Sequence, residues 1–345
     1  MPAMVSSPSI ISKAPSPTVA TSAAIPFATS LWPANTLSAN SRPYFPRRSI
    51  SCSLSQVQSQ ISNYIATDPR ISLACPICFK NLTLITSGVI FANCNSQTEL
   101  KCSGCLQRYS GKESHLELVI PYTDSKPLAT ELFRLRLVSL AYERGWRKSF
   151  SAGGFPGPEK EFEMMKKYLN SASGGNIIDA SCGSGLFARI FAKSGMFSLV
   201  VGLDFSENML LQCKEFIEQD DEIAKENIML VRSDIVRLPF VSGSVDAVHA
   251  GAALHCWPSS VSAVAEVCRV LKPGGVFVGT TYVFDGLIRN LPLLKPMSQA
   301  FTSFSGIQVF LDESEIEDIC SSCGLVDYQF IRNEQFIMFS AKKPS

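Results

Sequence analysis

Short apolar segments of strand length alternate with segments of helix length from Pro158 onward. The predicted helices cover 159–169, 185–193 and 207–218, and the predicted strands cover 176–180, 198–203, 228–232, 245–250 and 276–281. This alternation specifies an α/β fold with a doubly wound, mostly parallel sheet, because parallel neighbours need crossover helices. Ligands bind such sheets beyond the carboxyl ends of the strands, where the strand order reverses. The residues that follow each strand are therefore the functional candidates.

A glycine-containing turn follows the first of these strands. Gly183 and Gly185 would let the backbone approach a ligand closely, and the next helix N-terminus favours an anionic group. The turn also fits the G-x-G-x-x-A dinucleotide pattern, and Asp204 would bind ribose hydroxyls in either cofactor class. Asp179 before the glycines, the longer turn and Asp234 after the third strand favour another nucleoside cofactor. An NAD-dependent oxidoreductase stays as an alternative.

Five blocks then carry a resemblance to a known family: IIDASCGSG, VVGLDFSENML, VRSDIVRLPF, SVDAVHAGAALHCW and EVCRVLKPGGVF. In order and spacing they resemble class I S-adenosylmethionine-dependent methyltransferases, over about residues 158–342. More narrowly, the chain resembles the ubiquinone/menaquinone-biosynthesis type and the plant chloroplast group of uncharacterized methyltransferases with a cysteine unit in front. The resemblance implies a Rossmann-like methyltransferase fold with a seven-stranded sheet, and S-adenosyl-L-methionine as the cofactor.

The resemblance also implies roles for individual residues around that cofactor. Asp179 and the loop of Ser181, Gly183 and Gly185 would hold the methionine part. Asp204 would bind the ribose, Phe205 and Met209 would flank the adenine, and Asp234 with the Ile235 backbone would read the adenine edge. Ser181 stands where the family usually has glycine, so we expect a loop conformation that tolerates a Cβ atom. If this change abolished binding, the chain would be a non-catalytic cofactor-binding scaffold.

Methyl transfer needs mainly alignment of the acceptor and exclusion of water. His255, after the fourth strand, is the candidate catalytic residue, as a general base or as lining of the acceptor site. His249, within that strand, is predicted to be a packed core histidine. The aromatic segment 143–157 and the apolar insertion 285–310 are predicted to shape the acceptor pocket. They favour a small apolar aromatic or prenyl-lipid acceptor, which a lipid surface could present.

Two CxxC pairs, 23 residues apart, precede the main domain. Two tight knuckles can supply four thiolates to a structural Zn²⁺, and a unit spanning 73–122 is too small to be stable without a staple. The predicted ligands are Cys75, Cys78, Cys102 and Cys105. Nearby, Cys94 and His115 are interpreted as ordinary loop or surface residues. Later in the chain, Cys320 and Cys323 are interpreted as core contacts of a helix.

RNA is the competing acceptor class. A zinc-ribbon-like unit ahead of this fold also resembles bacterial rRNA guanine-N1 methyltransferases, and Arg144, Arg147 and Lys148 could contact phosphate in rRNA or tRNA. The net charge is only +1, however, and Lys80 and Lys101 are the basic residues between Cys78 and Cys102. A nucleic-acid partner is therefore less favoured than a small molecule.

The N-terminal segment has the composition of an organelle address. It is rich in Ser, Thr, Ala and Pro, and its first acidic residue is Asp68. This composition predicts a disordered chloroplast transit peptide over 1–52, and a mature protein in the stroma or at the plastoglobule surface. Residues 123–157 are predicted to form a linker and a substrate-side helix, and 158–345 the catalytic domain. No apolar run reaches the length of a membrane span, and the sequence gives no indication of the oligomeric state.

Overall fold

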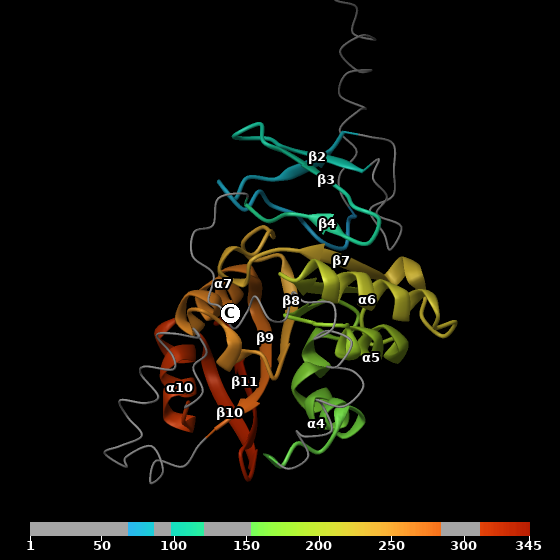
Figure 1. Cartoon of the computed structure of the whole chain (residues 1–345). Coiled ribbons are helices and arrows are strands. Elements are labelled where there is room, and N and C mark those ends of the chain that lie inside the picture. Colours follow the sequence, from blue (N-terminus) through green and yellow to red (C-terminus); the bar gives the residue numbers. More distant parts are fainter. Residues whose placement is uncertain (1–67, 86–97, 121–152, 284–310) are drawn as a thin grey trace, which may run out of the picture. The chain divides into compact units, whose positions relative to one another are not determined.

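The computed structural model describes residues 68–85, 98–120, 153–283 and 311–345, which Figure 1 shows in colour. Most of the strands in these ranges belong to one sheet, with the order β10-β11-β9-β8-β5-β6-β7-β4. The strands are β4 (Leu116–Glu117), β5 (Asn176–Ala180), β6 (Leu199–Asp204), β7 (Ile228–Arg232), β8 (Val245–Gly251), β9 (Leu271–Tyr282), β10 (Val326–Asn333) and β11 (Phe336–Lys342).

The sheet is mostly parallel, as predicted. Strands β4 to β9 pair in parallel, whereas β11 runs antiparallel to β9 and β10 antiparallel to β11. The expected number of seven strands is wrong, because the described sheet has eight. The additional strand is β4, in which Leu116 and Glu117 pair with Val231 and Arg232 of β7. It covers an edge of β7 that would otherwise present unpaired backbone groups.

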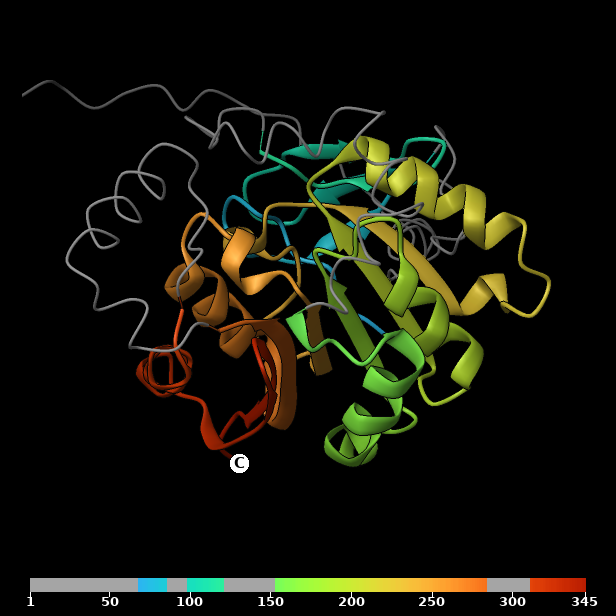
Figure 2. The same ribbon diagram turned by 60° about the horizontal axis from the view of Figure 1, so that its bottom comes forward.

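Helices cover both faces of this sheet (Figure 2). One face carries α4 (Pro158–Leu169), α5 (Leu186–Ser194) and α6 (Glu207–Glu218), and the other carries α7 (Ser260–Val270) and α10 (Glu313–Ser322). The short 3-10 turns are η2 (Asn170–Ala172), η3 (Lys225–Asn227), η4 (Ile235–Arg237) and η5 (Leu254–Cys256). Each face buries its own apolar cluster, and Phe191 of α5 and Ile316 of α10 are both fully buried.

Local sequence signals explain where these helices begin. Pro158 occupies the first turn of α4, where its missing N–H is not needed. The Ser206 hydroxyl accepts a hydrogen bond from the Met209 amide at the start of α6. Asp312 and Glu315 form a reciprocal capping box at α10. The predicted bounds of the first three helices and of β5 to β8 therefore agree with the structure to within one residue.

The strand order reverses between β5 and β8, which are neighbours. From β5 the chain continues to β6 and β7 on one side, and later to β8 and β9 on the other. A doubly wound sheet of this kind opens a crevice at the carboxyl ends of the two central strands. The segments 181–185 and 252–257 start at this point, and the ends of β6 and β7 lie beside them.

The cysteine-containing segment forms a small antiparallel sheet of β1 (Leu82–Leu84), β2 (Glu99–Cys102) and β3 (Arg108–Ser110). The described residues of this segment form no separate core, because Leu73 and Leu100 join the apolar cluster that includes Val231 and Phe240. The Ala74 amide also donates to the Pro239 carbonyl at 2.8 Å. The described part of the predicted unit 73–122 therefore shares its core with the large sheet.

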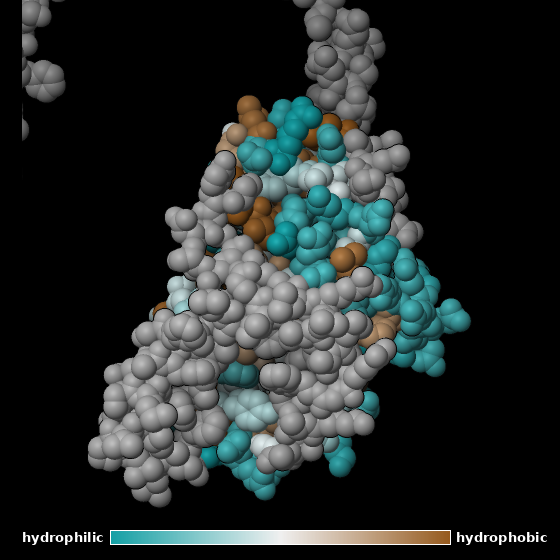
Figure 3. Space-filling view, in the orientation of Figure 1, coloured by the Kyte–Doolittle hydropathy of each residue, from teal (hydrophilic) through white to brown (hydrophobic). Residues whose placement is uncertain are grey.

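Apolar side chains also lie on the surface of this small sheet. Figure 3 shows brown and teal patches side by side over the region that Figure 1 labels β2 and β3. Among the described residues, Ile77, Ile85 and Leu106 are exposed large hydrophobic side chains of this part of the chain.

Several sequence predictions fall outside the described residues. These are the transit peptide 1–52, residues 123–152 of the predicted linker with Arg144, Arg147 and Lys148, and the apolar insertion 285–310. In the ranges that are described, the helices are all too short or too polar to traverse a lipid bilayer.

Candidate functional site

The glycine-containing turn after β5 is fastened to the end of β6. Gly183 and Gly185 have φ angles of 56° and 81°, in the left-handed region that glycine adopts readily. The Cys182 amide donates to the Leu203 carbonyl at 2.9 Å, and the Gly183 amide donates to Asp204 Oδ2 at 2.9 Å. Because these bonds fix the backbone, the turn is held in place before any ligand arrives.

Ser181 keeps the left-handed backbone geometry that glycine favours. Its φ angle is 59°, which lies in the small left-handed region that accommodates a Cβ atom at a cost in strain. Such geometry costs an ordinary residue about 1 to 2 kcal/mol. The Trp257 indole Nε1–H donates to Ser181 Oγ at 2.9 Å, a bond that stabilises by about 1 kcal/mol. The serine is tolerated because this bond offsets much of the strain.

Asp204 lies at the carboxyl end of β6, and its carboxylate links the glycine turn to the loop before α6. Its Oδ1 accepts from the Ser206 amide at 2.8 Å, while Oδ2 accepts from Gly183. Burial raises the pKa of Asp204, as does the nearby Asp179 charge, and the two amides act in the opposite direction. Each carboxylate oxygen retains a further lone pair. Asp204 can therefore accept hydrogen bonds from hydroxyl groups of a ligand while it also holds the loop.

Phe205 is held by an arginine from the neighbouring strand. The Arg232 guanidinium lies over the Phe205 ring at 5.5 Å, and Arg232 Nε donates to the Phe205 carbonyl at 2.9 Å. Another nitrogen of Arg232 donates to Glu117 Oε2 of β4 at 2.8 Å. Burial opposes ionisation of Glu117, yet bonds from His115 and Arg232 hold its pKa below the usual range. Strand β4 thus fixes the side chain that supports Phe205.

The predicted adenine-edge residues begin the turn after β7. Asp234 caps η4, where its Oδ1 accepts from the Val236 amide at 3.1 Å, and Ile235 is buried. The preceding Ser233 amide donates to the Asp204 carbonyl at 3.2 Å. The ends of β6 and β7 are therefore joined, which brings Asp204 and Asp234 to neighbouring loops. Met209 is buried in the first turn of α6, the helix that follows β6.

Asp179 has a partner that sequence reasoning missed. Asp179 Oδ1 lies 2.7 Å from Nδ1 of His249, and both side chains are buried. The prediction of a packed core histidine is confirmed in its burial, but this histidine also makes a specific polar contact. No local sequence signal marks this contact, because it depends on the register that places His249 of β8 directly across from Asp179 of β5.

His255 lies in η5, at the carboxyl end of β8. Its Nδ1 lies 2.9 Å from Thr281 Oγ1, and its ring meets Tyr282 edge-on at 5.7 Å. Burial lowers the pKa of His255 to about 4, so the ring is neutral near neutral pH. A neutral imidazole can accept a hydrogen bond from an acceptor hydroxyl, but it is a weak base. The adjacent Cys256 stays protonated, because burial raises its pKa to about 12.

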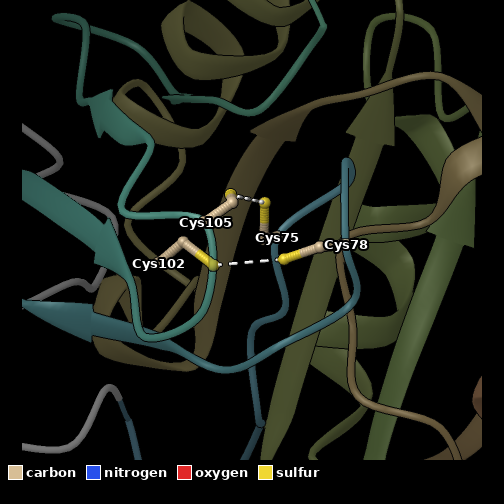
Figure 4. Close-up of side chains that lie close together, drawn as sticks. All are labelled: Cys75, Cys78, Cys102 and Cys105. Atoms are coloured by element: carbon tan, nitrogen blue, oxygen red, sulfur yellow. Dashed lines mark hydrogen bonds between the residues drawn. The ribbon is translucent and has the colours of Figure 1, made fainter. Parts of the chain in front are cut away.

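The four predicted metal ligands converge (Figure 4). Cys75 Sγ lies 3.6 Å from Cys105 Sγ, and Cys78 Sγ lies 3.4 Å from Cys102 Sγ. All four sulfur atoms lie within 4.8 Å of one another. A tetrahedral zinc with Zn–S bonds of about 2.3 Å requires sulfurs about 3.8 Å apart. The cluster therefore has the dimensions of a Cys₄ zinc site.

The two knuckles have the same backbone construction. The residues after the second cysteine of each pair, Phe79 and Leu106, have φ angles of 58° and 63°. In both knuckles the amide of the first cysteine donates to a carbonyl five residues ahead, at 2.8 Å in the first and 2.9 Å in the second. A left-handed residue is strained, and its recurrence at the same position of both knuckles indicates that both turns meet one structural requirement. Both turns aim two thiols at one centre.

The thiols of this cluster affect one another's protonation. The Lys80 backbone and then the Cys102 thiol lower the pKa of Cys78 to about 6. Burial and the neighbouring thiols outweigh a bond from the Gln107 backbone, and they raise the pKa of Cys105 to about 12. Deprotonation of one thiol therefore opposes deprotonation of its neighbours. A bound divalent cation would offset the repulsion between the resulting thiolates.

The remaining cysteine and histidine predictions have mixed outcomes. Cys320 is buried in the core and Cys323 is half-buried beside it, so their interpretation as core contacts is confirmed. His115 lies in the bend directly before β4, so its interpretation as a loop residue is confirmed, but it is fully buried and is not a surface residue. Its Nδ1 lies 2.7 Å from Ser114 Oγ and its Nε2 3.5 Å from Glu117, so it supports β4. Cys94 lies outside the described residues.

Comparison with known proteins gives an independent view of the chain. Residues 178–279 match the family described as methyltransferase domain. A chloroplastic uncharacterized methyltransferase of Arabidopsis thaliana is 56% identical over 281 residues, covering 79% of each chain. A second Arabidopsis protein with the same description is 46% identical over 316 residues, covering 88% of this chain and 87% of that protein.

More distant similarities are restricted to part of the chain or to the fold. Demethylmenaquinone methyltransferase of Lactococcus lactis is 30% identical over 181 residues, covering 48% of this chain and 71% of that protein. The structure of phosphoethanolamine N-methyltransferase 2 of Haemonchus contortus, in complex with S-adenosyl-L-methionine, aligns with a TM-score of 0.51 at 16% identity. That alignment covers 84% of this chain and 73% of the other. It shows a shared fold.

Proposed function

Because this chain belongs to the class I S-adenosylmethionine-dependent methyltransferases, we propose that it methylates a small apolar aromatic or prenyl-lipid acceptor in the chloroplast. One observation supports the cofactor site above all. Asp179, Asp204 and Asp234 come from the ends of three adjacent strands, and the glycine turn lies between the first two. Family membership also decides against the dinucleotide alternative for the same turn.

Each of these residues has a proposed task. Asp179 and the turn 181–185 bind the methionine part, and Asp204 accepts the ribose hydroxyls. Phe205, oriented by Arg232, packs on the adenine together with Met209. Asp234 and the Ile235 amide read the adenine edge. The site is built on strand ends that are already fastened to one another, so binding requires little reorganisation.

The chemistry is a displacement at carbon. The bound S-adenosyl-L-methionine supplies a methyl group that a sulfonium activates. The chain must hold the acceptor in line with that carbon, exclude water, and receive the proton that the acceptor loses. His255 is the proposed residue for the last task. With a pKa of about 4 it accepts a hydrogen bond from a hydroxyl and takes up the proton only as the new bond to carbon forms.

The acceptor class rests on two supports. The L. lactis relative, which is 30% identical over 48% of this chain, is named a demethylmenaquinone methyltransferase. His255 contacts one hydroxyl, that of Thr281, and one aromatic ring, that of Tyr282, and the buried Trp257 follows two residues later in the sequence. Such surroundings suit an aromatic ring rather than a phosphate backbone. A plastoglobule surface could present the acceptor.

We also propose a structural zinc ion, held by Cys75, Cys78, Cys102 and Cys105. The sulfur distances and the paired knuckles support it. The ion would fix the first knuckle, whose Pro76 carbonyl accepts from Arg237 at 2.9 Å. For location, the two relatives named chloroplastic support the chloroplast that the N-terminal composition predicts, with residues 1–52 as the transit peptide.

The test is transfer of a labelled methyl group from S-adenosyl-L-methionine by the full chain. Reduced plastid prenyl-quinone extract and total plastid RNA are offered in parallel. We expect label in the lipid fraction and none in RNA above a no-enzyme control. His255→Phe, which keeps an aromatic ring beside Tyr282, should bind the cofactor normally and lose most turnover. Label in RNA with an unlabelled lipid fraction would contradict the proposed acceptor and favour an RNA-gripping role for the cysteine unit.

A further inference from the structure

Two buried polar atoms under the glycine turn have no partner in the described part of the chain. They are Oδ2 of Asp179 and Nε2 of His249. The other oxygen of Asp179 and the other ring nitrogen of His249 meet at 2.7 Å. Asp179 is 2% exposed and His249 is not exposed at all. A pair with a purely structural purpose would be expected to satisfy all its polar atoms or to be replaced by apolar residues.

The register of the sheet places the two residues side by side. Asp179 of β5 and His249 of β8 are direct partners across the two central strands. Both side chains therefore project from the same face of the sheet, toward α5. The pair lies at the switch point, two residues before the turn that begins at Ser181.

The surroundings of His249 leave one direction for its polar contact. Its ring meets Phe187 and Phe191 of α5 edge-on, with ring centroids 4.7 Å and 5.1 Å away. These aromatic neighbours offer no polar partner to Nε2, so the tautomer with the proton on Nδ1 fits, donating to Asp179 Oδ1. The imidazole is wedged between rigid side chains, and it fixes the rotation of the Asp179 carboxylate.

We propose that His249 is a positioning residue, which orients the Asp179 carboxylate so that Oδ2 receives the α-ammonium group of the cofactor. The inference rests on the proposed cofactor site and deepens it. Among the described residues no group pairs with Oδ2 of Asp179, whereas Oδ1 lies against His249, and Asp179 belongs to the strand that leads into the turn. An ammonium group carries three donors and a positive charge, which match a buried carboxylate oxygen.

The proposal distinguishes ligands that carry the amino-acid part from ligands that do not. S-adenosylhomocysteine carries the α-ammonium group, whereas 5′-methylthioadenosine shares the adenosine and the thioether but lacks that group. Loss of His249 should weaken the first ligand and spare the second. A merely structural role for His249 would affect both ligands alike, because Asp204 and the adenine residues would be disturbed as well.

The experiment is titration calorimetry of both ligands against the full chain and four variants. The variants are His249→Leu, His249→Asn, Asp179→Asn and the double variant His249→Leu/Asp179→Asn. We expect His249→Leu to weaken S-adenosylhomocysteine roughly tenfold to a hundredfold, and 5′-methylthioadenosine less than about twofold. His249→Asn retains a donor group and should lose less. In the Asp179→Asn background, His249→Leu should add less than about twofold.

Other results would overturn the inference. Unchanged S-adenosylhomocysteine binding in His249→Leu would show that the orientation of Asp179 does not depend on His249. Equal weakening of both ligands in both His249 variants would show a structural role. Full additivity with Asp179→Asn would show that the two residues act separately. If the unchanged protein bound neither ligand, the proposed cofactor site itself would be wrong.

Discussion

Replacing Gly185 with alanine tests how closely α6 approaches the glycine turn. An alanine Cβ at this position would lie 2.1 Å from Cys213 Sγ, well inside van der Waals contact, and the φ angle is 81°. The same helix α5 provides a matched control at its other end. Gly195 has a φ angle of 64°, and a Cβ there would meet nothing within 4 Å.

The two substitutions share the conformational penalty and differ in the clash. A left-handed alanine costs about 1 to 2 kcal/mol, and overpacking against a buried neighbour adds about 1 to 3 kcal/mol. We therefore expect Gly195→Ala to lower the free energy of unfolding by about 1 kcal/mol and Gly185→Ala by about 3 kcal/mol. Cys213→Ala removes the clashing sulfur, so the double variant should be more stable than the sum of the single effects by about 1 to 2 kcal/mol.

Urea unfolding, followed by tryptophan fluorescence and by circular dichroism, measures these differences. The slope of free energy against urea should be the same in all variants, so that a shifted midpoint reports stability. The reasoning would be refuted if Gly185→Ala and Gly195→Ala lowered the free energy of unfolding equally. A double variant that is strictly additive would refute the contact between the turn and Cys213.

Elemental analysis should find one zinc per chain and its loss in Cys102→Ser, whereas a folded chain without zinc would contradict the Cys₄ site. Glu117→Gln should weaken S-adenosylmethionine binding several-fold in calorimetry, because Arg232 loses its ionic partner and supports Phe205 less firmly, and unchanged affinity would contradict this coupling. Burial lowers the pKa of His255 to about 4, so between pH 6.5 and pH 4 the unfolded chain binds a proton at this residue and the folded chain does not. The free energy of unfolding should therefore fall by at most about 3 kcal/mol as the pH falls through that window. This loss should be absent in His255→Phe, as urea unfolding at several pH values would measure.

The parts of the fold that sequence predicts are those set by local patterns. Strand β5 and helix α6 have the predicted bounds, because an apolar run with a turn behind it and an amphipathic segment with a serine cap are local signals. Strand β4 was missed because it is two residues long and lacks such a pattern. Its pairing with β7 spans more than a hundred residues of chain and is decided by packing against Val231.

The candidate site divides in the same way. The positions of Asp204, Asp234 and the glycines at strand ends could be predicted, because these residues follow the strands in a fixed order. The contacts that orient the neighbouring side chains could not be predicted from the sequence. Trp257 reaches Ser181, and His249 reaches Asp179, only once β8 lies beside β5, and Arg232 reaches Glu117 only once β4 joins the sheet. These contacts depend on strand register, which a single sequence does not encode locally.

Calorimetric titration of the full chain with S-adenosyl-L-methionine, compared with NAD(H), tests the central claim most directly. Asp204→Ala removes the carboxylate that joins the turn to β6, and Asp220→Ala, which removes a surface ion pair with Lys193, serves as the control. We predict that the unchanged chain and Asp220→Ala bind S-adenosyl-L-methionine alike. Asp204→Ala should bind it roughly tenfold to a hundredfold more weakly, since a hydrogen-bonded carboxylate contributes about 1.5 to 3 kcal/mol. Tight binding of NAD(H) with no response to S-adenosyl-L-methionine, or equal affinity in Asp204→Ala, would contradict the account.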